Sequence, residues 1–178
     1  MQPHVLVVGG TAILAPAVRV LAEEGWAVSV VSRSAERVAA ADRRAHAVIA
    51  DVTVMDDLAR ALDRARDERG PFGLALAYQP AAPPEAWAAL AGRVTGVLVA
   101  LLVSAYAAPH EAPAPPLAEG PNGGALVRHL LLGWHVEDGG RARWHRPEEI
   151  SAAALRTAGR ARSTVLGTVR PWQERPLH

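Results

Sequence analysis

Short apolar runs alternate with longer amphipathic stretches through most of the chain. The runs predict strands buried on both faces, at residues 5–8, 28–31, 47–50, 74–77, 97–103 and 126–136. The stretches between them have helical spacing. They predict a helix that ends at residue 25, helices over residues 34–41 and 53–69, and a helix that follows Pro83 and Pro84. The helix at 53–69 is expected to begin with a capping box of Thr53 and Asp56, and Asp56 is expected to pair with Arg60. Alternating elements of this kind are typical of a parallel sheet with right-handed crossovers.

The pattern changes after the fifth run. Residues 107–124 hold five prolines and three glycines, so we expect a long flexible loop there, either a flap over the site or a disordered connection. Beyond the sixth strand, residues 138–140 (Asp-Gly-Gly) predict a hairpin turn, and residues 142–144 can return antiparallel. Pro147 then opens a helix, and residues 165–169 predict a last strand. The 178 residues are therefore expected to form one α/β domain: a single Rossmann-like, doubly wound parallel sheet with a C-terminal β-hairpin and helix.

A glycine-rich turn joins the first strand to the first helix. Gly9 stands at the first position of the dinucleotide-binding fingerprint, whereas Ala12 and Ala15 stand where the second and third glycines are usual. Such a turn brings backbone N–H groups and a helix N-terminus against a pyrophosphate. The residues expected to bind the nucleotide here are Gly9, Gly10, Thr11, Ala12, Ile13 and Leu14. A doubly wound domain that has lost its nucleotide is the alternative.

The end of the second strand bears on the choice of cofactor. NAD-selective folds place an acid there for the ribose 2′-hydroxyl. In this chain Ser32, Arg33 and Ser34 stand there instead. A guanidinium matches phosphate oxygens, so this segment favours the 2′-phosphate of NADP(H) over NAD(H). The alternative is a solvated surface arginine.

The ends of the third and fourth strands supply further candidates. Asp51 and Val52 follow the third strand, where related folds contact the adenine, although Asp51 could equally cap a helix or a turn. Ala77, Tyr78 and Gln79 leave the fourth strand, where the nicotinamide ribose would lie. Tyr78 could donate a proton or simply pack over the ring.

Composition excludes several kinds of chemistry. The chain has no cysteine, which removes disulfides, thiolate nucleophiles and cysteine-based zinc sites, and we expect no metal site. All 19 of its basic residues are arginine, so no lysine can form a Schiff base. A formal charge of +1 gives no nucleic-acid or membrane footprint, and no apolar run is long enough to span a membrane. We therefore expect a cytoplasmic protein with a small-molecule substrate. The sequence leaves open whether copies of the chain form a homo-oligomer.

The opening VLVVGGTAILA resembles atypical members of the short-chain dehydrogenase/reductase superfamily. The segments GPFGLALAY at 70–78, LLLGWHVEDGGRARWHRPEEIS at 130–151 and LGTVRPWQERP at 166–176 are similar to a group of small proteins within it. The resemblance implies a serine at the end of the fifth strand, followed by a tyrosine with a lysine four residues later. Ser104 matches the serine, but Tyr106 is followed at that spacing by His110.

We therefore expect an NADP(H)-dependent reductase of a small C=N (imine or iminium) or C=O substrate, without the usual Tyr–Lys pair. The candidate catalytic residues are Tyr78, Ser104 and Tyr106. An iminium needs no proton before hydride attack, so its reduction tolerates the missing pair better than ketone reduction does. A nucleotide-sensing or partner-regulating protein without turnover and a non-redox cyclase or isomerase are the alternatives.

Overall fold

The computed structural model describes residues 2–9, 11–37 and 43–176. Within these ranges an eight-stranded sheet follows the order β10-β7-β5-β4-β1-β2-β3, all parallel, and β6 pairs antiparallel with β7. The strands of this sheet are β1 (His4–Val8), β2 (Ala27–Ser32), β3 (Ala45–Ile49), β4 (Phe72–Ala77), β5 (Val94–Leu102), β6 (Gly120–Asn122), β7 (Ala125–Leu132) and β10 (Thr164–Leu166). The expected α/β architecture is confirmed.

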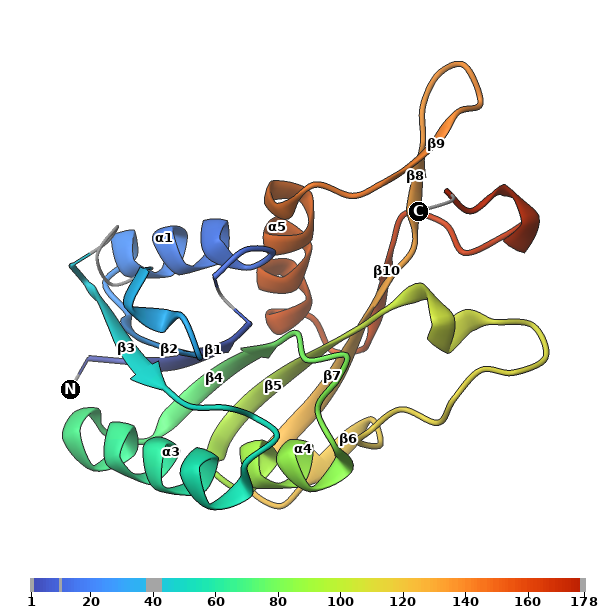
Figure 1. Cartoon of the computed structure of the whole chain (residues 1–178). Coiled ribbons are helices and arrows are strands. Elements are labelled where there is room, and N and C mark those ends of the chain that lie inside the picture. The colour runs from blue at the N-terminus through green and yellow to red at the C-terminus, as the bar shows by residue number, and fades with distance from the viewer. Residues whose placement is uncertain (1, 10, 38–42, 177–178) are drawn as a thin grey trace.

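Helices cover both faces of the sheet (Figure 1). The helices α1 (Ala15–Glu23) and α5 (Pro147–Ala158) lie on one face, and α3 (Met55–Arg69) and α4 (Pro84–Ala91) on the other. Val5 and Val7 of β1 pack in the core beneath α1 and α5, while Leu6 and Val8 pack in the core above α3 and α4. This alternation along a fully buried strand is the reason for its unbroken apolar run. No helix in the described ranges has the length and apolar character needed to cross a membrane.

The helix α3 begins differently from the prediction. Asp51 accepts hydrogen bonds from the backbone N–H (2.9 Å) and the hydroxyl (2.6 Å) of Thr53, so Thr53 is committed to a turn and no side chain caps the helix. Arg60 pairs with Asp57 rather than with the carboxylate of Asp56. The helix predicted at 34–41 extends into residues 38–42, which lie outside the described part of the chain.

The predicted sixth strand is two strands that belong to different sheets. It divides at Gly133 into β7 and β8 (Trp134–Val136), and β8 pairs with β9 (Ala142–Trp144) in a separate hairpin. At Gly133 a Cβ atom would lie 2.1 Å from the carbonyl oxygen of Thr168, so only glycine lets the two segments pass. The N–H groups of Gly133 and Trp134 donate to Leu166 (3.0 Å) and Thr168 (2.9 Å). The last strand ends at Leu166 rather than at residue 169, and Gly167, which follows it, has φ +73°.

The connection from β5 to β7 has more regular structure near its end than the sequence predicts. The segment 107–124 contains the strand β6, so its prolines and glycines do form part of a regular element. Leu117 is 8% exposed and packs in the core beside α4. Its carbonyl oxygen lies 2.9 Å from Nε2 of His129, and the carboxylate of Glu119 accepts a hydrogen bond from the N–H of Ser163 (3.0 Å). The last part of this connection is thus fastened to the sheet, whereas residues 109–115 are exposed.

Candidate functional site

A cavity of about 530 Å³ lies at the carboxyl ends of the central parallel strands. This is the edge at which open α/β sheets bind ligands. The strand ends and the glycine-rich turn form its floor, and the hairpin β8–β9, α5 and the C-terminal segment form its walls. Its lining residues are Ile13, Tyr78, Val103, Ser104, Ala105, Leu132, Gly133, Trp144, His145, Ile150, Trp172 and Arg175.

The glycine-rich turn is pressed against the end of β4. Gly9 has φ +82°, and its N–H donates to the carbonyl oxygen of Val31 (3.3 Å). A Cβ atom at Gly9 would lie 2.4 Å from the carbonyl oxygen of Tyr78 and 3.4 Å from the side-chain nitrogen of Gln79. The glycine is therefore required by the neighbouring strand as well as by any ligand. Gly10 lies outside the described residues.

The rest of the turn divides between ligand-accessible and core positions. Thr11 is half-buried and Ala12 is exposed, so the Ala12 methyl group is not held in the core. Ile13 lines the cavity, and its carbonyl oxygen accepts a hydrogen bond from the hydroxyl of Ser151 in α5 (3.1 Å). Leu14 is fully buried and precedes α1, so the structure places it in the core rather than at the surface of the turn.

The segment after β2 presents an exposed cation. Arg33 is exposed and makes no hydrogen bond or ion pair with the residues that the structure describes. The hydroxyl of Ser32 accepts a hydrogen bond from the N–H of Ser34 (3.2 Å), and the two hydroxyl oxygens lie 3.4 Å apart. One guanidinium and two hydroxyls therefore stand together at this strand end.

The residues after β3 are less available to a nucleotide than the sequence predicts. The two hydrogen bonds from Thr53 hold the pKa of Asp51 below its usual range, and the charge of Arg33 lowers it further. Asp51 is thus a turn residue, one of the alternatives that its position allowed. Val52 is half-buried and packs against the core of the α3 and α4 face.

The structure brings two of the three candidate catalytic residues together. Tyr78, at the end of β4, and Ser104, just beyond β5, both line the cavity. Tyr106 lies in the 3₁₀ turn Ser104–Ala107 and packs against the core of the opposite face of the sheet. Ala77 is fully buried in that same core, and Gln79 lies beside Gly9. The cavity therefore offers two hydroxyl groups, from Tyr78 and Ser104.

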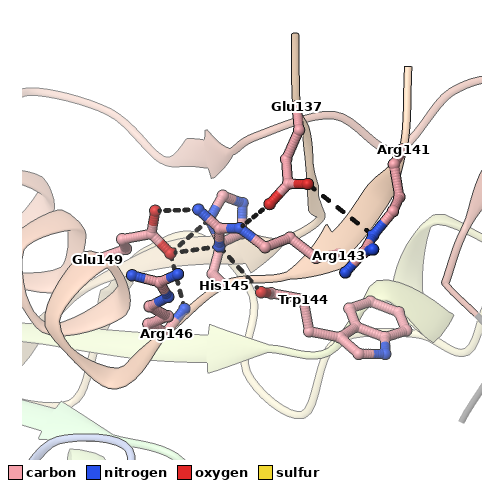
Figure 2. A network of polar contacts seen from close by, with 7 residues as sticks. All are labelled: Glu137, Arg141, Arg143, Trp144, His145, Arg146 and Glu149. Atoms are coloured by element: carbon pink, nitrogen blue, oxygen red, sulfur yellow. Dashed lines mark hydrogen bonds and ion pairs between the residues drawn. The ribbon is translucent and has the colours of Figure 1, made fainter. Parts of the chain in front are cut away.

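A network of charges, missed by the sequence reasoning, fastens the hairpin to α5 (Figure 2). Arg143 on β9 donates two hydrogen bonds to the carboxylate of Glu149, of 2.8 and 2.9 Å, and one to Glu137 of 3.2 Å. The backbone N–H of Arg146 also donates to Glu149 (2.7 Å). These hydrogen bonds lower the pKa of Glu149 to about 2, chiefly through Arg143, and raise that of Arg143. The signal in the sequence was Glu149, three residues after the helix cap, where a capping box places its acid.

His145 is held between this network and the cavity. Its side chain is 4% exposed, and Nδ1 lies 3.6 Å from a carboxylate oxygen of Glu149. Burial is the largest cause of its lowered pKa, which leaves the ring neutral at pH 7. Its ring lies 6.0 Å from that of His135, centroid to centroid. The described residues contain no cluster of three or more acidic or histidine side chains that could hold a metal ion.

Comparison with known proteins defines the fold. No family model matches the sequence, and no curated protein matches it significantly. A variant of the actinorhodin polyketide ketoreductase, solved with NADPH, matches with a TM-score of 0.68 at 15% identity, over 94% of this chain and 97% of that chain. A gluconate 5-dehydrogenase from Burkholderia cenocepacia, in complex with NADP and tartrate, matches with a TM-score of 0.65 at 17% identity, over 95% of both chains.

A short-chain type dehydrogenase/reductase from Mycobacterium marinum matches with a TM-score of 0.67 at 15% identity, again over 95% of both chains. The chain therefore has the fold of short-chain dehydrogenases/reductases.

Proposed function

We propose that this protein is an NADP(H)-dependent reductase whose substrate is a small compound with a C=N bond, or else a C=O bond. The observation that carries the proposal is the cavity that Ile13 of the glycine-rich turn shares with Tyr78 and Ser104. A nucleotide laid along the turn would reach this cavity with its nicotinamide end. The ketoreductase and the gluconate 5-dehydrogenase of similar fold, solved with NADPH and NADP, support this choice of cofactor.

The residues near the turn fit a phosphorylated dinucleotide. The exposed guanidinium of Arg33 and the hydroxyls of Ser32 and Ser34 have the chemistry that a ribose 2′-phosphate needs. The turn after β1 would approach the pyrophosphate with its backbone N–H groups. When bound, the reduced nicotinamide supplies a hydride.

The protein's own contribution is position and exclusion of water. Ile13, Leu132 and Ile150 provide apolar walls, and such walls keep water from the reacting carbon. An iminium carbon can accept a hydride while its nitrogen takes the electron pair of the C=N bond, so no proton has to move. A ketone also needs a proton donor, and Tyr78 and Ser104 place hydroxyl groups in the cavity that could supply one. With no lysine in the chain, the Tyr78 phenol has no lysine ammonium beside it.

The test is a fluorescence titration of the protein with NADPH, NADH and FAD, followed by assays of NADPH oxidation with cyclic imines and with ketones. We expect NADPH to bind more tightly than NADH, FAD not to bind, and the imines to be reduced faster. Absence of NADPH binding would exclude the reductase.

A nucleotide-binding protein without turnover is the second candidate. The placement of Tyr106 on the opposite face of the sheet from the cavity favours it. NADPH binding together with no oxidation on either panel would identify this function instead.

A further inference from the structure

The outer part of the cavity has a chemistry that the reductase proposal does not explain. Its walls include Trp144, Ile150 and Trp172, and Arg175 is the one side chain charged at neutral pH among the described residues that line it. His145 also lines the cavity, but burial lowers its pKa, so it is neutral at pH 7. None of the lining residues is a carboxylate. The described lining thus combines a broad apolar surface with one positively charged side chain.

Arg175 contacts an aromatic ring, whereas the arginines that the fold holds most firmly pair with carboxylates. Arg143 and Arg93 each donate to both oxygens of one carboxylate. Arg175 makes no ion pair with the described residues, and its guanidinium lies 4.7 Å from the centroid of the Trp172 ring. A cation over an aromatic face keeps its N–H groups free for an anion.

The segment that carries Arg175 is anchored at the cavity. Trp172 packs edge-on against Trp134, with ring centroids 6.1 Å apart, and Trp134 is fully buried. The side chain of Arg170 donates to the carbonyl oxygen of Ala107 (2.8 Å), which ties the segment to the turn after β5. The segment is therefore placed by contacts with two other parts of the chain, and the exposed Arg175 is placed by its contact with Trp172.

We propose that the cavity binds a small aromatic compound that carries a carboxylate. The aromatic body would lie against the walls that include Trp144 and Trp172, and the carboxylate would bind the guanidinium of Arg175. The reaction of such a substrate would be the reduction proposed above, and in this respect the inference rests on the proposed function. Binding of the carboxylate itself needs no cofactor.

The experiment compares 2-naphthoate with 2-naphthamide, which share the ring system and differ in charge. Their binding is measured by calorimetry on the wild-type protein and on Arg175→Gln, Arg175→Lys and Arg162→Gln. Arg162 is an exposed arginine outside the cavity lining and is the matched control. Circular dichroism checks that each variant is folded.

We expect naphthoate to bind the wild-type protein at least tenfold more tightly than naphthamide. Arg175→Gln should weaken naphthoate about tenfold or more and change naphthamide less than twofold. Arg175→Lys should recover part of the loss, and Arg162→Gln should change neither ligand. Equal affinity for the two ligands, no naphthoate binding at millimolar concentration, or equal losses in Arg175→Gln and Arg162→Gln would overturn the inference.

A parallel titration with NADPH separates the two proposals. If naphthoate binding depends on Arg175 but NADPH does not bind, the carboxylate site stands and the reductase is wrong. If NADPH binds and is oxidised while naphthoate shows no preference over naphthamide, the reductase stands and the carboxylate site is wrong.

Discussion

Arg143 on the hairpin strand β9 holds both carboxylate oxygens of Glu149, in the first turn of α5, at 2.8 and 2.9 Å. The two residues are six positions apart, and the bend between them carries His145, with Trp144 just before it, into the cavity wall. Because Glu149 also accepts from the backbone N–H of Arg146, one carboxylate fixes the hairpin and starts the helix. The wall of the candidate site therefore depends on a pair of charges that do not themselves line it.

Removing the charge of Glu149 should destabilise the fold at neutral pH. We expect Glu149→Gln to lower the free energy of unfolding by about 1–2 kcal/mol at pH 7, less than a fully buried pair because a third of the side chain is exposed. The pKa of Glu149 in the fold is about 2, below its ordinary value. Its contribution is therefore complete above about pH 4.5 and is lost as the pH falls toward 2.

Urea unfolding of both proteins between pH 7 and pH 2.5 measures this difference. Glu148→Gln is the control, because Glu148 lies in the same helical turn but makes no ion pair among the described residues. The account of the network is wrong if the two variants lose equal stability, or if the gap for Glu149→Gln stays constant down to pH 2.5.

Replacing Gly9 with alanine should destabilise the fold even when no ligand is bound. Gly9→Ala combines a positive φ, which costs about 1–3 kcal/mol, with an overlap on the carbonyl oxygen of Tyr78. Gly25 has a similar φ of +87°, but a Cβ atom there would meet nothing within 4 Å. We expect Gly9→Ala to lose more stability in urea unfolding than Gly25→Ala, and equal losses would show that the contact with Tyr78 relaxes freely.

Arg33→Ala should weaken NADPH far more than NADH. Loss of a charge-assisted contact to the 2′-phosphate predicts a decrease in NADPH binding free energy on the order of 1–3 kcal/mol, with NADH nearly unchanged. Arg37→Ala controls for general charge, since Arg37 is a nearby exposed arginine. Equal losses for the two cofactors in a fluorescence titration would mean that Arg33 does not read the phosphate.

Tyr106 should contribute little to turnover. Its side chain packs against the core on the face away from the cavity, so Tyr106→Phe should lower kcat/KM for an imine by less than the 10²–10⁴-fold typical of a lost general acid or base. Tyr78→Phe and Ser104→Ala, at positions that line the cavity, should affect ketone reduction more than imine reduction. Ketone reduction that collapses in Tyr106→Phe would restore a tyrosine acid.

Local signals predicted the framework of the fold. The apolar runs identified the parallel strands because a strand that is buried on both faces is apolar at successive positions. That pattern can be seen without knowing which strands pair with it. Gly9 marked the turn after β1, and Pro147 marked the start of α5, because turns and helix starts depend on the backbone preferences of a few adjacent residues. The segment Ser32–Ser34 was located by its place at the end of a strand.

Contacts between distant segments decided the rest. The break at Gly133 depends on the carbonyl oxygen of Thr168, 35 positions later, and no local pattern in an apolar run indicates it. Tyr106 and Ser104 are two residues apart, yet one packs in the core and the other lines the cavity, because the turn after β5 separates their side chains. The sequence by itself determined where strands and turns form, since those depend on neighbours in the chain. Only the tertiary structure decided which side chains share a cavity, because that depends on packing between residues that the sequence keeps far apart.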